Sequence, residues 1–130
     1  MPETQRAIDF SENNPESQPF WNAAAEGRFI LPQCSACGRF HWYPRAICPF
    51  CFSEKIEWRP ATGKGKIYSY SVMRSATVPY VIAYVTLEEG ITMLTNIVDC
   101  DLGTLMLGQN VKLVFKKSDG GVSVPMFTPA

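Results

Sequence analysis

The chain has 130 residues, of which 46% are hydrophobic and 12% aromatic. This length suits a single domain, or one small module joined to one compact domain, and it supplies enough apolar residues for a core. Twelve lysines and arginines balance twelve aspartates and glutamates, and this formal net charge of zero argues against a protein whose binding depends mainly on attraction to phosphates.

Targeting signals are not visible in the sequence. No apolar run approaches the roughly 20 residues that a membrane-spanning helix needs. The start, MPETQRAIDF, lacks the basic residues and the apolar stretch of a secretory signal. We therefore expect a cytoplasmic protein without membrane contact. In that compartment thiols stay reduced, so we do not expect a disulfide framework.

The first segment, residues 1–17, is polar and contains two prolines. Its one basic residue, Arg6, is outnumbered by Glu3, Asp9, Glu12 and Glu16. Such a composition cannot bury enough apolar surface to fold alone. We predict a flexible acidic tail that becomes ordered only on a partner.

The next segment, residues 18–30, is predicted to contain an N-terminal helix. Ser17 suits an N-cap, Pro19 suits the first turn, and Gly27 suits the end of the helix. The residues that share one apolar face in this prediction are Phe20, Trp21, Ala24 and Ala25. Because a helix of this length is marginal in isolation, the face must pack on the chain's own core or on a partner.

Residues 31–59 contain two C-x-x-C pairs, within the stretch CSACGRFHWYPRAICPFC. Two such pairs supply the four soft ligands of a closed tetrahedral zinc site, here Cys34, Cys37, Cys48 and Cys51. A glycine after the first pair suits the tight turn around the ion. With four thiolates in use, no position remains for water or substrate, so we predict a structural zinc ribbon without zinc hydrolysis.

Two other roles for these thiols compete with structural zinc, namely redox chemistry and an iron site. Redox chemistry normally needs one C-x-x-C pair at a helix N-terminus within a strand–helix–strand unit, whereas this segment holds two pairs and is rich in loops. A rubredoxin-type iron site would use the same four ligands, and the sequence does not separate iron from zinc.

The remaining side chains give no catalytic set, and we expect no catalytic residue in this chain. His41 is the single histidine, and it is predicted to pack or to lie on the surface because the metal already has four ligands. Acidic residues are scattered at turns and in the tail, so they provide no carboxylate pair for acid–base catalysis. Cys100 is predicted to be buried or incidental.

Residues 60–130 show the alternation of β-strands. Predicted strands cover 63–73, 79–87, 91–98, 111–117 and 122–127, with turns at EEG and DGG. A longer connection separates the third strand from the fourth. This order is that of a five-stranded OB-type barrel, although another small barrel or sandwich would give the same strand count. The predicted fold is therefore mainly β: an N-terminal helix, a zinc ribbon and a β barrel.

Several motifs together closely resemble one known family. They are a PFW helix, LPQCSACGRFHWYPRAICPFC, ATGKGKIYSYSVM, PYVIAYVTLEEG, LGQNVKLVF and PMFTPA, and they span about residues 18–129. The resemblance is to the OB-fold acyl-CoA-associated proteins with a rubredoxin-like zinc ribbon, long catalogued as a domain of unknown function. It implies the OB-fold and a non-catalytic role in lipid or steroid metabolism.

Members of that family accompany thiolase-like enzymes, including thiolases, hydroxymethylglutaryl-CoA synthases, aldolases and hydratases. The resemblance thus implies an accessory subunit that scaffolds such an enzyme and helps to bind or channel acyl-CoA. No family motif marks the contacts with CoA. The candidate contacts with a partner or CoA are Phe20, Trp21, Arg39, Phe40, Trp42, Tyr43 and Arg45, with Arg59 as a further phosphate contact.

A zinc ribbon joined to an OB barrel also occurs in proteins that bind single-stranded nucleic acid, and this is the alternative hypothesis. Tyr68, Tyr70 and Tyr84 would then stack on bases. Residues 61–130, however, hold six basic residues against five acidic ones, which is too little positive charge for such a groove. We therefore consider nucleic acid an unlikely partner.

Overall fold

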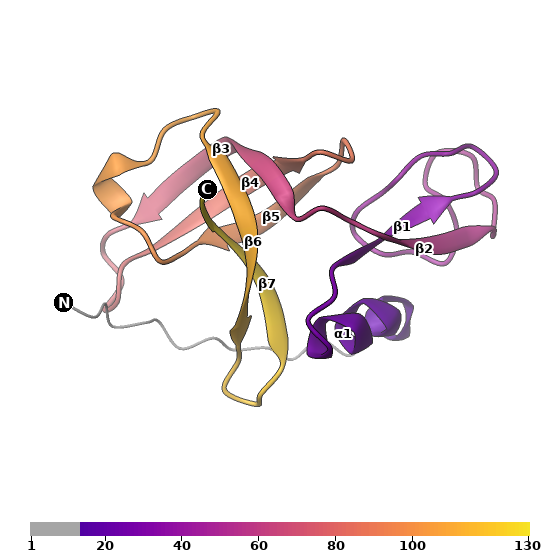
Figure 1. Cartoon of the computed structure of the whole chain (residues 1–130), viewed down its shortest axis with the longest axis horizontal. Helices are drawn as coiled ribbons and strands as arrows, with labels where there is room; N and C mark the ends of the chain where they lie inside the picture. Colours follow the sequence, from indigo (N-terminus) through magenta and orange to yellow (C-terminus); the bar gives the residue numbers. More distant parts are fainter. Residues whose placement is uncertain (1–13) are drawn as a thin grey trace.

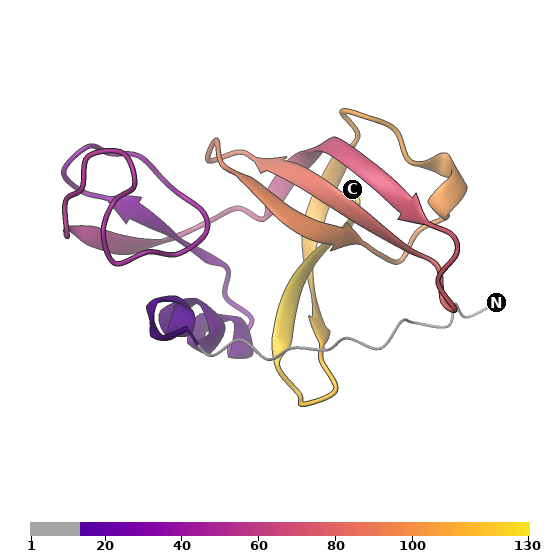
Figure 2. The ribbon, with the colours of Figure 1, turned by 180° about the vertical axis from the view of Figure 1, so that it is seen from behind.

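The computed structural model describes residues 14–130, so most of the predicted acidic tail lies outside the described residues. A short helical segment leads into a small ribbon, and a β barrel follows at the other end of the molecule (Figure 1). The view from behind shows the same separation of the ribbon and the barrel (Figure 2). No helix within residues 14–130 is both long and apolar enough to span a membrane.

The end of the segment assigned to the tail is ordered. A 3-10 turn, η1 (Pro15–Ser17), precedes the helix, and the backbone N–H of Ala46 donates to Glu16 Oε2 at 2.5 Å. Residues 14–17, which were predicted to belong to the flexible tail, are therefore ordered, and a loop of the ribbon contributes one of the hydrogen bonds that hold them.

The helix α1 (Gln18–Ala25) is shorter than the segment 18–30, and Gly27 turns the chain with a φ of +78°. Its buried face consists of Phe20, Ala23 and Ala24. Ala25 is exposed, so its predicted place on this face is wrong; Ala23, three residues after Phe20, lies on the buried side instead. This face packs against the ribbon and the last barrel strand.

The ribbon contains two strands that the sequence analysis did not predict, β1 (Ile30–Cys34) and β2 (Ile56–Pro60). They pair antiparallel, with Cys34 opposite Ile56. Pro32 lies within β1, and a proline normally argues against a strand. A two-stranded sheet has only edge strands, however, so the missing N–H can face outward.

The barrel consists of β3 (Lys64–Met73), β4 (Tyr80–Leu87), β5 (Thr92–Ile97), β6 (Asn110–Lys117) and β7 (Ser123–Pro129). It closes in the order β3-β4-β5-β7-β6, with the short helix η2 (Leu102–Thr104) in the long connection between β5 and β6. The predicted fold, mainly β with one helix, a ribbon and a five-stranded OB-type barrel, is confirmed.

The inward side chains of the barrel form one apolar core with residues of the helix and β1. Phe20 from α1, Phe29 and Leu31 belong to this core, so the ribbon module is anchored to the barrel by its first part. At Gly65 the neighbouring strand passes so closely that a Cβ would lie 2.7 Å from Val85 Cγ1. That contact explains the glycine in the middle of a strand.

The seams of the barrel differ in length. Strand β5 pairs with β4 over the whole length of β5, and β6 pairs with β7 from Val111 to Lys117. Between β5 and β7 there is one parallel pair, Ile97 with Phe127. Most of the outer edge of β5 is therefore not covered by β7.

Candidate metal centre and ribbon–barrel cleft

The four ribbon cysteines converge on one point. Their Sγ atoms all lie within 4.8 Å of one another; the distance is 3.6 Å from Cys34 to Cys51 and 3.7 Å from Cys37 to Cys48. Four sulfurs about 2.3 Å from a tetrahedral zinc ion lie about 3.8 Å apart, whereas a disulfide needs about 2.05 Å. The geometry therefore fits a metal ion held by four thiolates and does not fit a disulfide pair.

Two matching turns hold the sulfurs. In the first, Gly38 N donates to Cys34 O at 2.8 Å; in the second, Phe52 N donates to Cys48 O at 2.9 Å. Gly38 has a φ of +80° and Phe52 a φ of +65°, so both turns end in the left-handed region. The predicted role of Gly38 is confirmed by this geometry, and Phe52 takes the same place in the second turn.

Hydrogen-bond donors around the sulfurs favour thiolates. Backbone N–H groups, foremost that of Cys37, lower the pKa of Cys34. Burial acts to raise the pKa of Cys48, but backbone N–H groups such as Phe50 N, 3.4 Å from Sγ, lower it to about 7. A backbone N–H also acts to lower the pKa of Cys51, yet burial and the other three sulfurs raise it to about 12.

A bound cation would remove this last proton, because metal coordination deprotonates thiols outright. Cys34 and Cys48 are fully buried, while Cys37 and Cys51 reach the surface. The four ligands form a closed set, so the ion's contribution is structural: it ties the two turns together. Cys100 lies apart from them, half-buried against the barrel core.

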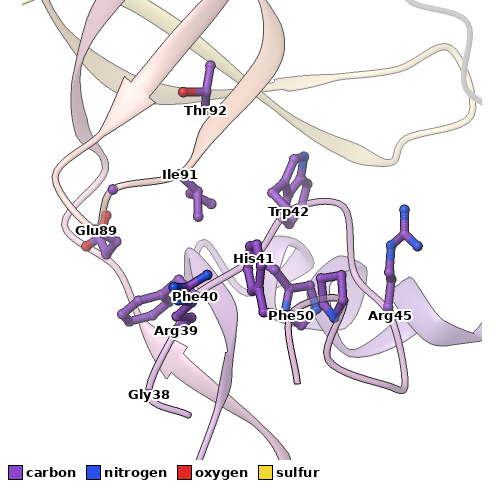
Figure 3. A pocket seen from close by; sticks show the side chains of 12 residues that line it. Gly38, Arg39, Phe40, His41, Trp42, Arg45, Phe50, Glu89, Ile91 and Thr92 are labelled. Carbon is purple, nitrogen blue, oxygen red and sulfur yellow. The ribbon is translucent and has the colours of Figure 1, made fainter. Parts of the chain in front are cut away.

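The ribbon and the barrel enclose a cleft of about 660 Å³. Figure 3 shows Glu89 and Ile91, from the β4–β5 turn, on the side opposite the ribbon residues, with Thr92 of β5 behind them. The ribbon side includes Arg39 and Arg45. The cleft is therefore lined by apolar and aromatic groups together with two cations.

Two polar groups of the cleft are buried without a hydrogen-bond partner among the described residues. One is the imidazole ring of His41, a residue 2% exposed, whose two nitrogens are both buried. The other is the carboxylate of Glu89, through its Oε1 atom. The other oxygen of Glu89 accepts the backbone N–H of Thr62 at 3.0 Å. Burial lowers the pKa of His41; the Arg45 backbone acts to raise that pKa and the Arg45 guanidinium to lower it, and the net shift is downward. The predicted packing role of His41 is confirmed.

The structure separates the predicted contact residues into three groups. Phe20 is 1% exposed and belongs to the core, so its assignment as a surface contact is wrong: the apolar face of the helix packs on the chain itself. Trp21, Phe40 and Trp42 are half-buried against that core. The exposed members are Arg39, Tyr43 and Arg45.

Arg59 lies on β2, outside the cleft lining, and pairs with Glu57. The surface also contains apolar residues that the sequence analysis did not select. On the ribbon these are Ile47, Phe50 and Phe52, and on the barrel Leu94, Met106 and Leu107. Arg39 stacks on the Phe50 ring, with Cζ 4.8 Å from its centroid. Neighbours of cysteines are expected to pack around the metal, so nothing in the sequence marked Phe50 and Phe52 as exposed.

A second groove, of about 440 Å³, runs between the helix and ribbon on one side and strands β5 and β7 on the other. Trp42 and Thr92 line both this groove and the cleft, so the two hollows are neighbours. Of the tyrosines proposed to stack on bases, Tyr70 instead donates its hydroxyl to Leu105 O at 2.8 Å. That hydrogen bond fixes the Tyr70 side chain in the wall of the barrel.

A ribbon with a closed set of four thiolates, joined to a five-stranded OB-type barrel, defines a class of two-module proteins. Within that class the chain belongs to the ChsH2 family. The model of the ChsH2 rubredoxin-like zinc ribbon domain matches residues 21–57, and that of the ChsH2 C-terminal OB-fold domain matches residues 58–116. This family is the one that the sequence motifs resemble.

Three relatives differ in how much of them the chain covers. A "DUF35 domain-containing scaffold protein" of Methanothermobacter thermautotrophicus is 41% identical over 65% of this chain and 69% of its own length. A probable enoyl-CoA hydratase alpha subunit of Thermomonospora curvata is 33% identical over 85% of this chain, which spans 37% of that relative. The benzoylsuccinyl-CoA thiolase subunit BbsA of Geobacter metallireducens is 28% identical over 62% of this chain and 57% of its own length.

Among solved structures, the chain is similar to one chain of the Ltp2–ChsH2(DUF35) aldolase. The TM-score is 0.82 at 30% identity, over 92% of this chain and 98% of that chain. The arrangement of ribbon and barrel described above is therefore shared with a chain known from an enzyme complex.

Proposed function

We propose that this chain is a non-catalytic accessory subunit of a CoA-dependent enzyme of the thiolase, aldolase or hydratase type. In this proposal it scaffolds that enzyme and holds part of its acyl-CoA in the ribbon–barrel cleft. Its relatives include a scaffold protein, a thiolase subunit and a hydratase subunit, and the similar solved chain comes from an aldolase. These names support the enzyme class of the partner.

The observation that carries the proposal is the cleft itself. It combines two cations, Arg39 and Arg45, with aromatic and aliphatic side chains and one carboxylate, Glu89, and the ribbon that forms one wall is fixed by the thiolate centre. Acyl-CoA has a matching division: anionic phosphates at one end and a long, mostly uncharged pantetheine arm. Guanidinium groups bind phosphates through paired, charge-assisted hydrogen bonds.

The described residues do not assemble a catalytic set. His41 is enclosed, and burial lowers its pKa below the usual value of a histidine. The thiolates of the ribbon are all used by the metal site. Glu89 is the one carboxylate in the cleft lining, and acid–base catalysis commonly needs a second titratable group at a defined distance. The chemistry is therefore assigned to the partner enzyme.

The partner surface in this proposal is centred on the exposed ribbon. Tyr43, Phe50 and Phe52 are 36%, 51% and 77% exposed, respectively, and Arg39 and Arg45 lie beside them. Aromatic residues and arginine are enriched in the energetically important part of protein interfaces. Trp21 and Trp42, half-buried behind them, complete the aromatic surface.

The proposal is tested with the chain co-expressed with the thiolase-fold enzyme of its own organism. We expect a stable complex, CoA binding by that complex, and no turnover of acyl-CoA by the isolated chain. Replacing both Arg39 and Arg45 by methionine should weaken CoA binding by at least tenfold. Arg74→Met, in the β3–β4 connection, removes one arginine charge outside the cleft and should leave binding unchanged; it is compared with each single variant, Arg39→Met and Arg45→Met, as well as with the double variant. Failure to form a complex, or turnover by the chain alone, would contradict the proposal.

A further inference from the structure

Within residues 14–130, the outer edge of strand β5 is unpaired along its first half. One side of β5 pairs with β4 from Thr92 to Ile97, but on the other side the pairing with β7 is confined to Ile97 and Phe127. Strand β7 cannot extend this pairing easily, because Pro125 has no N–H and its carbonyl already accepts the Thr95 hydroxyl at 3.3 Å. The edge that begins at Thr92 therefore stays uncovered by the barrel.

The ladder shows which backbone groups face outward. Leu87 N donates to Ile91 O, and Val98 N donates to Phe127 O, each at 2.8 Å. Because residues of an antiparallel strand alternate between its two sides, the N–H and C=O of Thr92 and Leu94 point away from β4. Within residues 14–130, these outward N–H and C=O groups of Thr92 and Leu94 have no hydrogen-bond partner.

The open edge lies in the groove of about 440 Å³. All five residues from Thr92 to Asn96 line it, with Val124 and Pro125 of β7 beside them and Trp42 across from them. No lysine, arginine, aspartate or glutamate is among the lining residues. The groove thus offers backbone donors and acceptors in alternation, between walls that are uncharged and only partly polar.

These properties define the chemistry of the occupant. Alternating N–H and C=O groups of a strand edge are complemented by another extended backbone, as in β-strand addition. The uncharged walls complement side chains without charge, since a charged group placed there would lose its hydration without gaining an ion pair. A helix or a compact loop satisfies its own backbone groups and would leave those of Thr92 and Leu94 unpaired.

We propose that an extended, uncharged segment of the partner enzyme pairs with the outer edge of β5 at Thr92–Leu94. This inference rests on the proposed function and adds the mode of docking to it. Since Trp42 and Thr92 also line the ribbon–barrel cleft, the docked segment ends beside the site assigned to acyl-CoA. The edge therefore positions the partner's backbone next to the ligand.

The direct test is amide hydrogen exchange at single-residue resolution on the free chain and on the co-expressed complex. We expect the Thr92 and Leu94 amides to exchange at least 100-fold more slowly in the complex. Met93 and Thr95, whose N–H groups face β4, serve as internal controls and should be protected in both states. Equally fast exchange of Thr92 and Leu94 in an intact complex would overturn this inference alone, whereas the absence of any complex would overturn the proposed function as well.

A pair of variants adds an affinity measurement. Leu94→Pro removes the outward N–H and leaves the bonds to β4 in place, and edge strands tolerate proline. Leu94→Ala removes the side chain and keeps the N–H. We expect the first to weaken the complex at least tenfold and the second less than threefold. Equal effects would overturn the inference, as would a dimer of the free chain that Leu94→Pro abolishes, because that dimer would assign the edge to a second copy. If Leu94→Pro fails to fold, the exchange measurement on the unaltered chain decides.

Discussion

The ribbon and the barrel solve the problem of stability in different ways. The barrel surrounds a continuous apolar core, with Val81, Val85 and Phe127 fully buried. Within residues 34–55 of the ribbon the buried residues are Cys34, His41, Pro44 and Cys48, while Phe50 and Phe52 face solvent. A segment that buries so little cannot offset the conformational entropy of folding, so its order depends on the ion.

This difference has a consequence for function. A ribbon fixed by four thiolates does not need all of its aromatic residues for a core, and Tyr43, Phe50 and Phe52 remain at the surface. The barrel fully or partly buries most of its apolar residues, with Leu94, Met106 and Leu107 among the exposed exceptions, and in our proposal it offers a partner the edge of β5. The most sensitive tests of the comparison are therefore changes that act on one module and spare the other.

The largest effect is expected for loss of the metal. Structural zinc contributes about 10–16 kcal/mol of binding free energy in zinc-finger peptides, so Cys37→Ser or removal of the ion should unfold the ribbon. The barrel, with its own core, should keep its strand signal in circular dichroism. Cys100→Ser is the matched control and should change neither metal content nor folding. A folded, metal-free Cys37→Ser ribbon would contradict the account.

A core deletion in the barrel should have the next largest effect. Phe127→Ala removes a fully buried ring and should cost about 3–5 kcal/mol of unfolding free energy. Ile47→Ala, at a 48% exposed ribbon position, should cost less than about 0.5 kcal/mol. Denaturant unfolding of the metal-loaded protein measures both values. Similar costs at the two positions would show that the ribbon has an apolar core of its own.

The buried histidine gives the ribbon–barrel junction a pH dependence. Burial lowers the folded-state pKa of His41, so the unfolded chain binds the additional proton first, and stability falls as the pH drops below about 6.5. The slope from this residue is at most about 1.4 kcal/mol per pH unit. His41→Phe should remove this contribution to the dependence of unfolding free energy on pH between about pH 6.5 and 5. Any loss of the metal at low pH affects the unaltered protein and the variant alike, so it cancels in the comparison. Identical slopes for the two proteins would show that His41 does not contribute.

The smallest expected effects compare the two cysteine turns. Gly38 has a φ of +80° and open space around its Cα, so Gly38→Ala should cost about 1–2 kcal/mol through the backbone alone. Phe52 pays that conformational cost already, so Phe52→Gly should change the stability by less than about 1 kcal/mol. Thermal unfolding of both variants measures the difference. A larger loss for Phe52→Gly would mean that its exposed ring stabilises the ribbon.

Much of the architecture follows from short-range patterns in the sequence. Two C-x-x-C pairs determined the metal ligands, because four sulfurs at that spacing can reach one ion. Alternation of apolar residues located all five barrel strands to within a few residues. The strands β1 and β2 were missed because Pro32 and the charged residues around Trp58 mask any alternation. The two strands pair beside the metal site, where the ligand Cys34 lies opposite Ile56, so their pairing is a contact between the two ends of the ribbon.

The surface was harder to predict than the fold. The PFW motif made Phe20 and Trp21 equivalent, and only the packed structure shows that Phe20 enters the core while Trp21 remains half-buried. The open edge of β5 has no sequence signal at all, since it results from the short seam with β7 near Pro125. An unpaired strand edge depends on how strands far apart in the sequence pair with one another. The alternation of apolar residues within one strand carries no information about that pairing.

The central claim is that this metal-fixed chain works as a subunit of another enzyme. Native mass spectrometry of the tagged chain, purified from its own cells in a volatile buffer near neutral pH, tests it most directly. The account predicts one metal ion per chain and a complex that contains a thiolase-fold subunit. A metal-free monomer without that partner would contradict it.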